Sequence, residues 1–110
     1  MPWSSKTHLA RFDFVTPLDA AAKSAVQRYL TRLVHDIDGV REYEVTSLRR
    51  LARGQLRADV QLRLEAENRE VIKKQHIRSQ LDTLIGSARY MTVRGVPAPL
   101  IRLYRTRLVS

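Results

Sequence analysis

Apolar and polar residues alternate along two segments of the chain, as they do in strands that are covered on one face. From residue 55 the alternation is strict, with Leu56, Ala58, Val60, Leu62, Leu64 and Ala66 on one side and Arg57, Asp59, Gln61, Arg63 and Glu65 on the other. His8 to Phe14 follows the same rule: Phe12 and Phe14 face one way, Arg11 and Asp13 the other. Because successive side chains of a strand point to opposite faces, the pattern predicts a two-layer sheet with one covered face.

Two further segments have apolar residues at the spacing of a helix. In the first they are Leu18, Ala22, Val26, Tyr29, Leu30, Leu33 and Ile37, and in the second they are Ile77, Leu81, Leu84, Ile85 and Ala88. Thr16 is expected to cap the first helix, Pro17 to begin it and Gly39 to end it. Asn68 is a plausible cap for the second, but Arg69 to Lys74 could instead be a short strand, because its β-branched pair favours extended structure.

The remaining segments complete the predicted fold. Val40 to Leu51 reads as a strand whose alternation slips between Ser47 and Leu48, as at a bulge, and Arg53-Gly54 supplies the turn that follows. Tyr90 to Val96 is predicted as the last strand. The order strand, helix, strand, strand, helix, strand indicates an α+β fold, the ferredoxin-like split βαβ sandwich: a four-stranded antiparallel sheet with two helices on one face. Residues 1–96 would form this single domain, and residues 97–110 an extended basic C-terminal arm.

The charge of the chain indicates its class of partner. Of 110 residues, 20 are Lys or Arg and 11 are Asp or Glu, which gives a net charge of +9, and all but four of the basic residues are arginine. A guanidinium group donates two parallel hydrogen bonds to a phosphate, which the compact ammonium of lysine does not. The composition therefore predicts a nucleic-acid partner, with an ordinary basic surface as the alternative.

Residues for catalysis are not arranged in any pattern that supports a reaction. There are no cysteines, and the three histidines, His8, His35 and His76, fall in separate predicted elements. The one local group of histidine and carboxylates, His35 with Asp36 and Asp38, is more simply explained by a helix end, where a histidine meets the helix dipole. With four scattered glycines there is no glycine-rich phosphate loop. We expect neither an enzyme nor a metal, a cofactor or a small-molecule substrate.

The basic residues form three candidate nucleic-acid-binding clusters. The first surrounds the predicted hairpin turn, the second begins the second helix, and the third lies in the arm: Arg49, Arg50, Arg53 and Arg57; Arg69, Lys73, Lys74 and Arg78; Arg102, Arg105 and Arg107. Each has a simpler alternative. The cluster at the hairpin could be an ordinary solvated turn, and the cluster at the second helix could be the solvent-exposed face of that helix.

The arm is too apolar to be left loose in water. It either adds to the domain's own sheet as a strand or lies on a partner with Tyr104 on a base or in a hydrophobic pocket, and we favour the partner. Trp3 at the other end is a candidate anchor to a partner, or a cover for an edge of the core.

The N-terminal residues and the hydropathy of the chain indicate the cellular compartment in which the protein is expected. No stretch approaches the roughly 18 apolar residues of a spanning helix, and residues 1–16 lack the apolar centre of a secretory signal. We therefore expect no membrane span and no secretion. The absence of cysteine is compatible with a reducing compartment, and the acid-free, basic opening of the chain has some organellar character, so the expected location is the bacterial cytoplasm or the mitochondrial matrix.

Two families resemble the chain. Arg49-Arg50-Leu51-Ala52, an arginine pair followed by Leu and Ala in the middle hairpin, resembles small-subunit ribosomal protein six, a ferredoxin-like binder of ribosomal RNA with mitochondrial members. The likeness in element order covers roughly residues 8–96. Ile77-Arg78-Ser79 through Tyr104, a helix leading to a Val-Pro strand and a late aromatic, is similar to ribosome-binding factor A, whose fold is of the KH type. Neither resemblance implies catalytic residues.

The expected function is that of a non-enzymatic RNA-binding structural component of a ribonucleoprotein particle, most simply a ribosomal protein, with ribosomal RNA and neighbouring proteins as its partners. The similarity to ribosome-binding factor A would instead imply a ribosome assembly factor. A third possibility is a small structural subunit of a respiratory or phage particle, in which the arginines pair with acidic neighbours or lipid headgroups.

Overall fold

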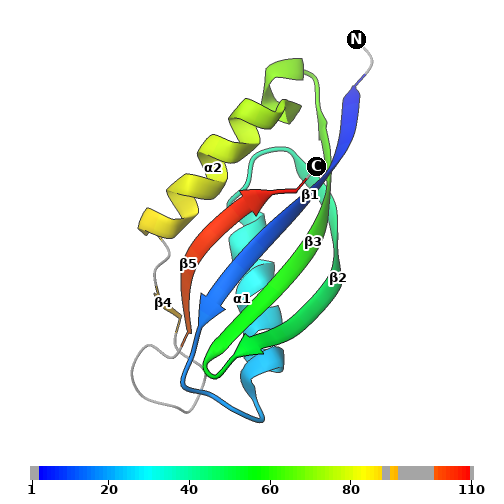
Figure 1. Ribbon diagram of the computed structural model, residues 1–110. Coiled ribbons are helices and arrows are strands. Elements are labelled where there is room, and N and C mark those ends of the chain that lie inside the picture. Colours follow the sequence, from blue (N-terminus) through cyan, green and yellow to red (C-terminus); the bar gives the residue numbers. More distant parts are fainter. Residues whose placement is uncertain (1–2, 88–89, 92–100, 110) are drawn as a thin grey trace.

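The computed structural model describes residues 3–87, 90–91 and 101–109 (Figure 1). In this part of the chain one sheet contains five strands: β1 (Ser4–Val15), β2 (Val40–Ala52), β3 (Gln55–Ala66), β4 (Tyr90–Met91) and β5 (Ile101–Leu108). Their order across the sheet is β2-β3-β1-β5-β4, and each pair of neighbours is antiparallel. The helices are α1 (Ala22–His35), α2 (Lys74–Ser87) and the short 3-10 helix η1 (Arg69–Ile72).

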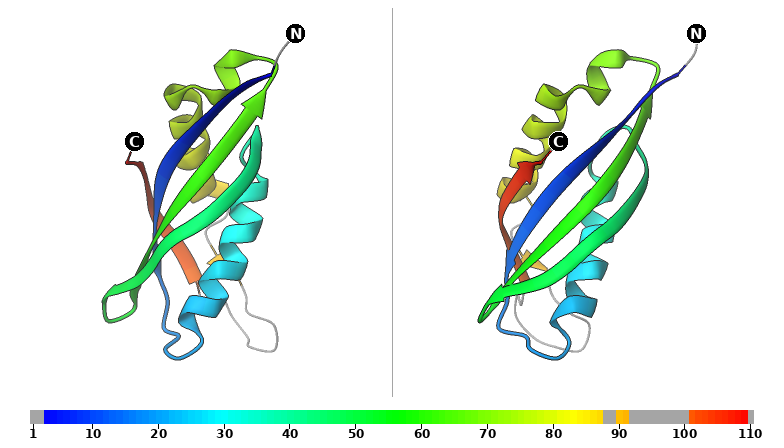
Figure 2. Two further views of the ribbon diagram at one scale, coloured as in Figure 1. Left: turned by 90° about the vertical axis from the view of Figure 1, so that its right-hand side faces the viewer. Right: turned by 45° about the vertical axis from the view of Figure 1, so that its right-hand side comes forward.

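Both helices cover the same face of the sheet, as Figure 2 shows. The core between the layers takes Phe12 and Phe14 from β1, the alternate apolar residues Leu56 to Ala66 from β3, and the inner sides of the helices. The other face, called the open face below, is not covered by a helix among the described residues (Figure 2). The predicted α+β fold is confirmed, because β2-β3-β1-β5 has the strand order of a ferredoxin-like sheet.

The prediction of a C-terminal arm is wrong for residues 101–108. This segment is strand β5, which pairs with β1 from Ala10↔Leu108 to Val15↔Arg102 and buries Ile101 and Leu103 in the core. The structure shows the alternative, addition of this segment to the domain's own sheet. The apolar residues decide it, because burying two of them here is more favourable than leaving them in water.

The predicted last strand is also displaced. Of Tyr90 to Val96 only β4, two residues long, is seen as a strand, and it pairs with the start of β5. Residues 92–100, which hold the rest of that prediction and the first part of the predicted arm, lie outside the described residues. The place beside β1 that the predicted strand was to fill belongs to β5, so the domain boundary at residue 96 does not hold.

The start of α1 differs from the prediction. Thr16 does not cap the helix: its hydroxyl accepts a hydrogen bond from the Leu18 amide at 3.1 Å, which closes a turn, and the helix begins only at Ala22. The Thr16 amide donates to the Gly54 carbonyl at 2.8 Å. These two bonds hold the end of β1 against the hairpin tip. The helix therefore begins several residues after Thr16 and not directly behind it.

The segment before α2 is neither a strand nor a continuation of the helix. Asn68 accepts a hydrogen bond from the Glu70 amide at 3.0 Å and caps η1, and α2 then begins at Lys74. The inner face of α2 is as predicted at Ile77, Leu81 and Leu84, which are buried. Ala88, the last residue expected on that face, lies outside the described residues.

The hairpin between β2 and β3 turns at Arg53-Gly54, as predicted, and Gly54 has a φ of +77°, which favours glycine. In β2 the register against β3 shifts between Val45 and Ser47, one residue earlier than the predicted slip, and again near each end of the strand. Each shift changes which β2 side chains face the helices, so the pairing with β3 decides the face on which each β2 arginine lies.

Candidate nucleic-acid interface

The open face is crossed by a row of residues that the four long strands place side by side. Arg49 of β2 lies opposite Arg57 of β3, Arg57 opposite Asp13 of β1, and Asp13 opposite Arg105 of β5. We call this row the first rung. It contains three arginines and one aspartate and so has a net charge of +2. Side chains directly opposite on antiparallel strands are close enough to interact, and in this rung Asp13 bonds to both Arg57 and Arg105.

Asp13 is the centre of the first rung. Only 1% of it is exposed, and both of its carboxylate oxygens accept hydrogen bonds. Arg57 donates through Nε at 2.8 Å and Nη2 at 3.3 Å, and Arg105 donates through Nε at 2.8 Å. Burial alone would raise the pKa of Asp13, but the hydrogen bonds and charges of Arg57 and Arg105 outweigh it and hold that pKa below its ordinary value. The hydrogen bond to Asp13 in turn raises the pKa of Arg57. Asp13 therefore stays ionised and fixes two guanidinium groups.

A second rung lies two residues further along the strands. It contains Ser47 of β2, Asp59 of β3, Arg11 of β1 and Arg107 of β5, with a net charge of +1. Arg11 Nε donates to Asp59 Oδ1 at 2.9 Å, and both side chains are about one-fifth exposed. The two rungs repeat one plan, in which a carboxylate on a central strand holds an arginine of its neighbour.

Two pairs of arginines face each other across strands in these rungs: Arg49 with Arg57, and Arg11 with Arg107. Like charges directly opposite each other destabilise a sheet. In each pair one arginine is bonded to a carboxylate, while the other, Arg49 or Arg107, has no carboxylate within 4 Å among the described residues. Both pairs thus have donors that are free for an anion from outside the domain.

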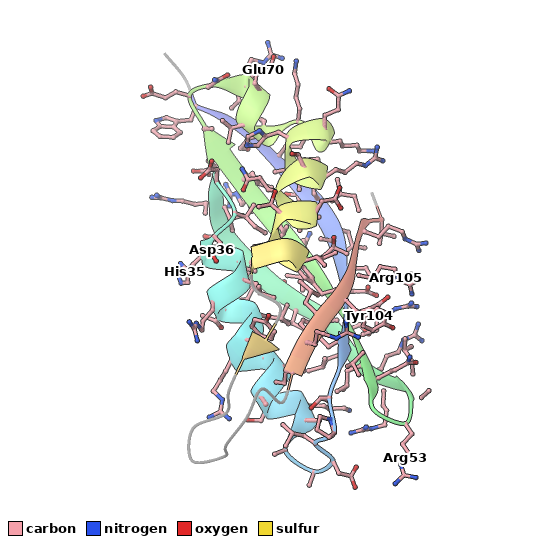
Figure 3. The ribbon with its side chains drawn as sticks, turned by 90° about the vertical axis from the view of Figure 1, so that its left-hand side faces the viewer. His35, Asp36, Arg53, Glu70, Tyr104 and Arg105 are labelled. Carbon is pink, nitrogen blue, oxygen red and sulfur yellow. The ribbon has the colours of Figure 1, made fainter. Side chains whose placement is uncertain are left out.

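A bulge in β5 adds an aromatic ring beside the first rung. The register shifts between Asp13↔Arg105 and Phe14↔Leu103, which leaves Tyr104 as the extra residue. Figure 3 shows Tyr104 and Arg105 on the side of β5 away from the helices. The Arg105 guanidinium carbon lies 5.9 Å from the centre of the Tyr104 ring, within the range of a cation–π contact. The bulge therefore places a half-buried ring next to the fixed arginines.

The first predicted cluster is divided between the faces. Arg49 and Arg57 belong to the first rung, and Arg53 lies at the hairpin tip (Figure 3). Arg50 lies on the helix side, where Nη2 donates to the Asp19 carbonyl at 3.2 Å and ties the hairpin to the loop before α1. Arg50 therefore does not share the face of Arg49 and Arg57, because neighbours along a strand point to opposite faces.

The second predicted cluster lies outside the rungs. Arg69 and Lys73 lie in and just after η1, and Lys73 forms an ion pair with Glu70 at 2.7 Å. Lys74 is the first residue of α2 and is exposed. Arg78 lines a groove between α2 and β5 together with Arg107. These four residues do not form one surface with the first cluster, and only Arg78 lies near an open-face arginine.

The third cluster joins the first through the sheet. Arg105 and Arg107 are members of the two rungs, and Arg102 pairs with Val15 of β1 beyond the first rung. Trp3, the other proposed anchor, is 63% exposed and lines a shallow hollow with Ser5, Arg41 and Glu65. It does not cover the core, so of its two predicted roles only that of a partner contact stays open.

Four residues of the two rungs were not among the predicted binding residues: Arg11, Asp13, Ser47 and Asp59. The alternation had placed Arg11 and Asp13 on one face of a strand, but it contained no sign of which strand would lie beside them. Only the register between β1 and β3 makes Asp13 a partner of Arg57 and Asp59 a partner of Arg11.

No group of three or more potential metal ligands is present in the described part of the chain, and His35 and Asp36 lie at the exposed end of α1 (Figure 3). Neither described helix α1 nor α2 has the length and apolar character needed to cross a bilayer. No family model, no curated protein and no solved structure matches this chain.

Proposed function

We propose that this chain is a non-enzymatic RNA-binding structural component of a ribonucleoprotein particle, of the ribosomal class, and that the two rungs bind the sugar–phosphate backbone. The observation that carries this proposal is the strand register, which places Arg49 opposite Arg57 and Arg11 opposite Arg107. A phosphate between two guanidinium groups removes their repulsion and accepts charge-assisted hydrogen bonds from both.

The spacing of the two pairs suits a chain of phosphates. Neighbouring strands are about 4.8 Å apart, and two residues along a strand span about 6.7 Å. The midpoint of Arg49 and Arg57 is then about 12 Å from that of Arg11 and Arg107, since they differ by two strand spacings and one such step. A nucleic-acid strand that crosses the sheet obliquely can place one phosphate at each position while Asp13 and Asp59 keep their own arginines.

The chemistry of the open face favours backbone contacts over base recognition. Within the described residues, β1 and β3 carry charged, polar and aliphatic side chains on this face and no aromatic ring. Among the described side chains, Tyr104 is the ring that lies beside the rungs, and it offers a place for one unpaired base to stack. Contacts of this kind position a protein on folded RNA without reading its sequence. The resemblance to small-subunit ribosomal protein six favours ribosomal RNA.

The test compares two double variants of equal charge. Arg49→Gln with Arg107→Gln removes the arginines that lack a carboxylate partner, and Arg28→Gln with Arg32→Gln removes two exposed arginines of α1 on the other side of the molecule. Binding to structured RNA hairpins is measured by fluorescence anisotropy over a series of salt concentrations. Each lost phosphate contact should reduce the slope of log K against log salt by roughly 0.7–0.9.

The first double variant should therefore flatten the slope by about 1.4–1.8 and weaken binding at low salt, while the α1 variant keeps the wild-type slope. Equal losses in both variants would show that net charge alone drives binding and would refute the site. If the wild-type protein binds RNA no better than an unrelated protein of equal charge, the function itself is wrong.

The particle is tested separately. The protein, isolated from cells under mild salt, should sediment with a large ribonucleoprotein and should return to the top of the gradient after nuclease treatment. Sedimentation that nuclease leaves unchanged would instead indicate an assembly held by proteins alone and would contradict the proposal.

A further inference from the structure

Among the described residues, β5 has no strand partner along most of its outer edge. β4 pairs only with Ile101 and Arg102, and beyond them no strand of the described chain lies on this side (Figure 1). The outward backbone groups of residues 103–108 consequently have no strand partner among the described residues. A row of such N–H and C=O groups is a template on which another extended chain can pair.

A groove runs beside this edge. It has a volume of about 350 Å³ and separates β5 from α2, with lining residues Arg78, Leu81, Asp82, Thr106, Arg107 and Leu108. The Thr106 hydroxyl oxygen is buried and has no hydrogen-bond partner in the described part of the protein. A strand added to β5 would point every second side chain into this groove and the others onto the open face.

The opposite edge of the sheet is less suited to pairing. β2 has three register shifts against β3, and Glu42 and Glu44 are exposed along it. Bulges and charges are the features by which natural sheets prevent pairing at an edge. β5 has a single irregularity, at Tyr104, and Thr106 to Leu108 are regularly paired with β1. The two edges therefore differ, and β5 is the one that fits an added strand.

We propose that the outer edge of β5 binds an extended segment of a partner protein in which small apolar and acidic residues alternate. The apolar side chains fill the groove against Leu81 and Leu108, and the acidic ones lie on the open face beside Arg105 and Arg107. Charge complementarity selects this occupant. A second copy of β5 would instead set arginine against arginine across the new strand pair, which is unfavourable.

This inference goes beyond the proposed function, because it concerns a protein partner that pairs with the outer edge of β5. Arg107 belongs both to the second rung and to the groove, so the experiment is done on the full chain without RNA. Failure of the peptide to bind leaves the RNA proposal standing, and failure to bind RNA leaves this one standing.

The probe is a capped peptide of alternating valine and glutamate, and its control is the same peptide with lysine in place of glutamate. Backbone amide shifts of the isotope-labelled protein should change along residues 103–108 and in the part of α2 that lines the groove. The lysine peptide should bind at least tenfold more weakly. Absence of these shifts, changes along β2 instead, or equal binding of the two peptides would overturn the proposal.

Substitutions at the groove sharpen the test. Thr106→Phe fills the groove and should lower the affinity for the glutamate peptide at least tenfold. Thr106→Val keeps the volume of the side chain and should leave that affinity within about twofold of wild type. Arg107→Gln should weaken it about two- to fivefold, as expected for an exposed ion pair, and the distant Arg28→Gln should not. If Thr106→Phe misfolds, the comparison of Arg107→Gln with Arg28→Gln still tests the proposal, and equal affinities of these two variants would refute it. A free protein that dimerises through β5 in sedimentation equilibrium would assign the edge to a second copy and refute the partner.

Discussion

Replacing Asp13 by asparagine should destabilise the protein through loss of a single charge. The change keeps the size of the side chain and one acceptor oxygen, but it leaves Arg57 and Arg105 on the open face without the anion that holds them. A hydrogen bond to a charged group contributes about 1.5–3 kcal/mol, and this value applies to the Asp13 carboxylate, whose side chain is 1% exposed. Arg105 is 58% exposed, so solvent screens its contact and it adds at most about 1 kcal/mol.

The sum predicts that Asp13→Asn lowers the free energy of unfolding by about 2–4 kcal/mol at neutral pH. At roughly 4 °C per kcal/mol for a domain of this size, the melting temperature should fall by about 8–16 °C. Urea unfolding followed by circular dichroism measures the first quantity and a thermal scan the second. Asp36→Asn is the matched control, because Asp36 is exposed at the end of α1 and its substitution should change stability by less than about 0.5 kcal/mol.

The pH dependence gives an independent check. The pKa of Asp13 is lower in the folded protein than its ordinary value of 3.8, so its contribution to stability is complete above that ordinary value. The contribution is lost as the pH falls through the lower folded pKa. The difference in stability between wild type and Asp13→Asn should therefore be constant from pH 5 to pH 7 and shrink in stronger acid. A loss below about 0.5 kcal/mol at neutral pH, or one that stays the same in acid, would refute the role given to Asp13.

Two further substitutions test the elements that hold the rungs in place. Gly54→Val puts a β-branched residue at a φ of +77° with its Cβ 3.2 Å from the Thr16 carbonyl oxygen, so thermal unfolding should show a loss of about 2 kcal/mol. Gly54→Asn should lose less, and an equal loss would contradict the backbone argument. His8→Leu removes the hydrogen bond from buried His8 Nε2 to the Ile72 carbonyl oxygen at 2.9 Å, which should cost about 1–3 kcal/mol in urea unfolding. The same substitution at exposed His35 should have little effect, and matching losses would disprove the role of His8.

The fold class was predictable because each long element has a period that does not depend on its neighbours. The alternation in β3 indicates a half-covered strand whatever lies beside it, and the spacing from Ala22 to Ile37 indicates a helix that packs by one side. The fate of residues 101–108 was not predictable in the same way. An apolar segment that alternates with arginine fits both a strand of this sheet and a contact with a partner, and only the space beside β1 decides between them.

For the candidate site, too, the sequence predicts some features and the strand register alone decides others. The sequence by itself determined that the chain is rich in arginine, that Arg11 and Asp13 share one face of a strand, and that Arg49 and Arg57 flank a turn. It could not determine that these residues form one row with Arg105, because register is a relation between strands that are far apart in sequence. A shift of one residue would send every side chain of a strand to the other face. The tertiary structure alone decides which arginines meet a carboxylate and which lie opposite another arginine.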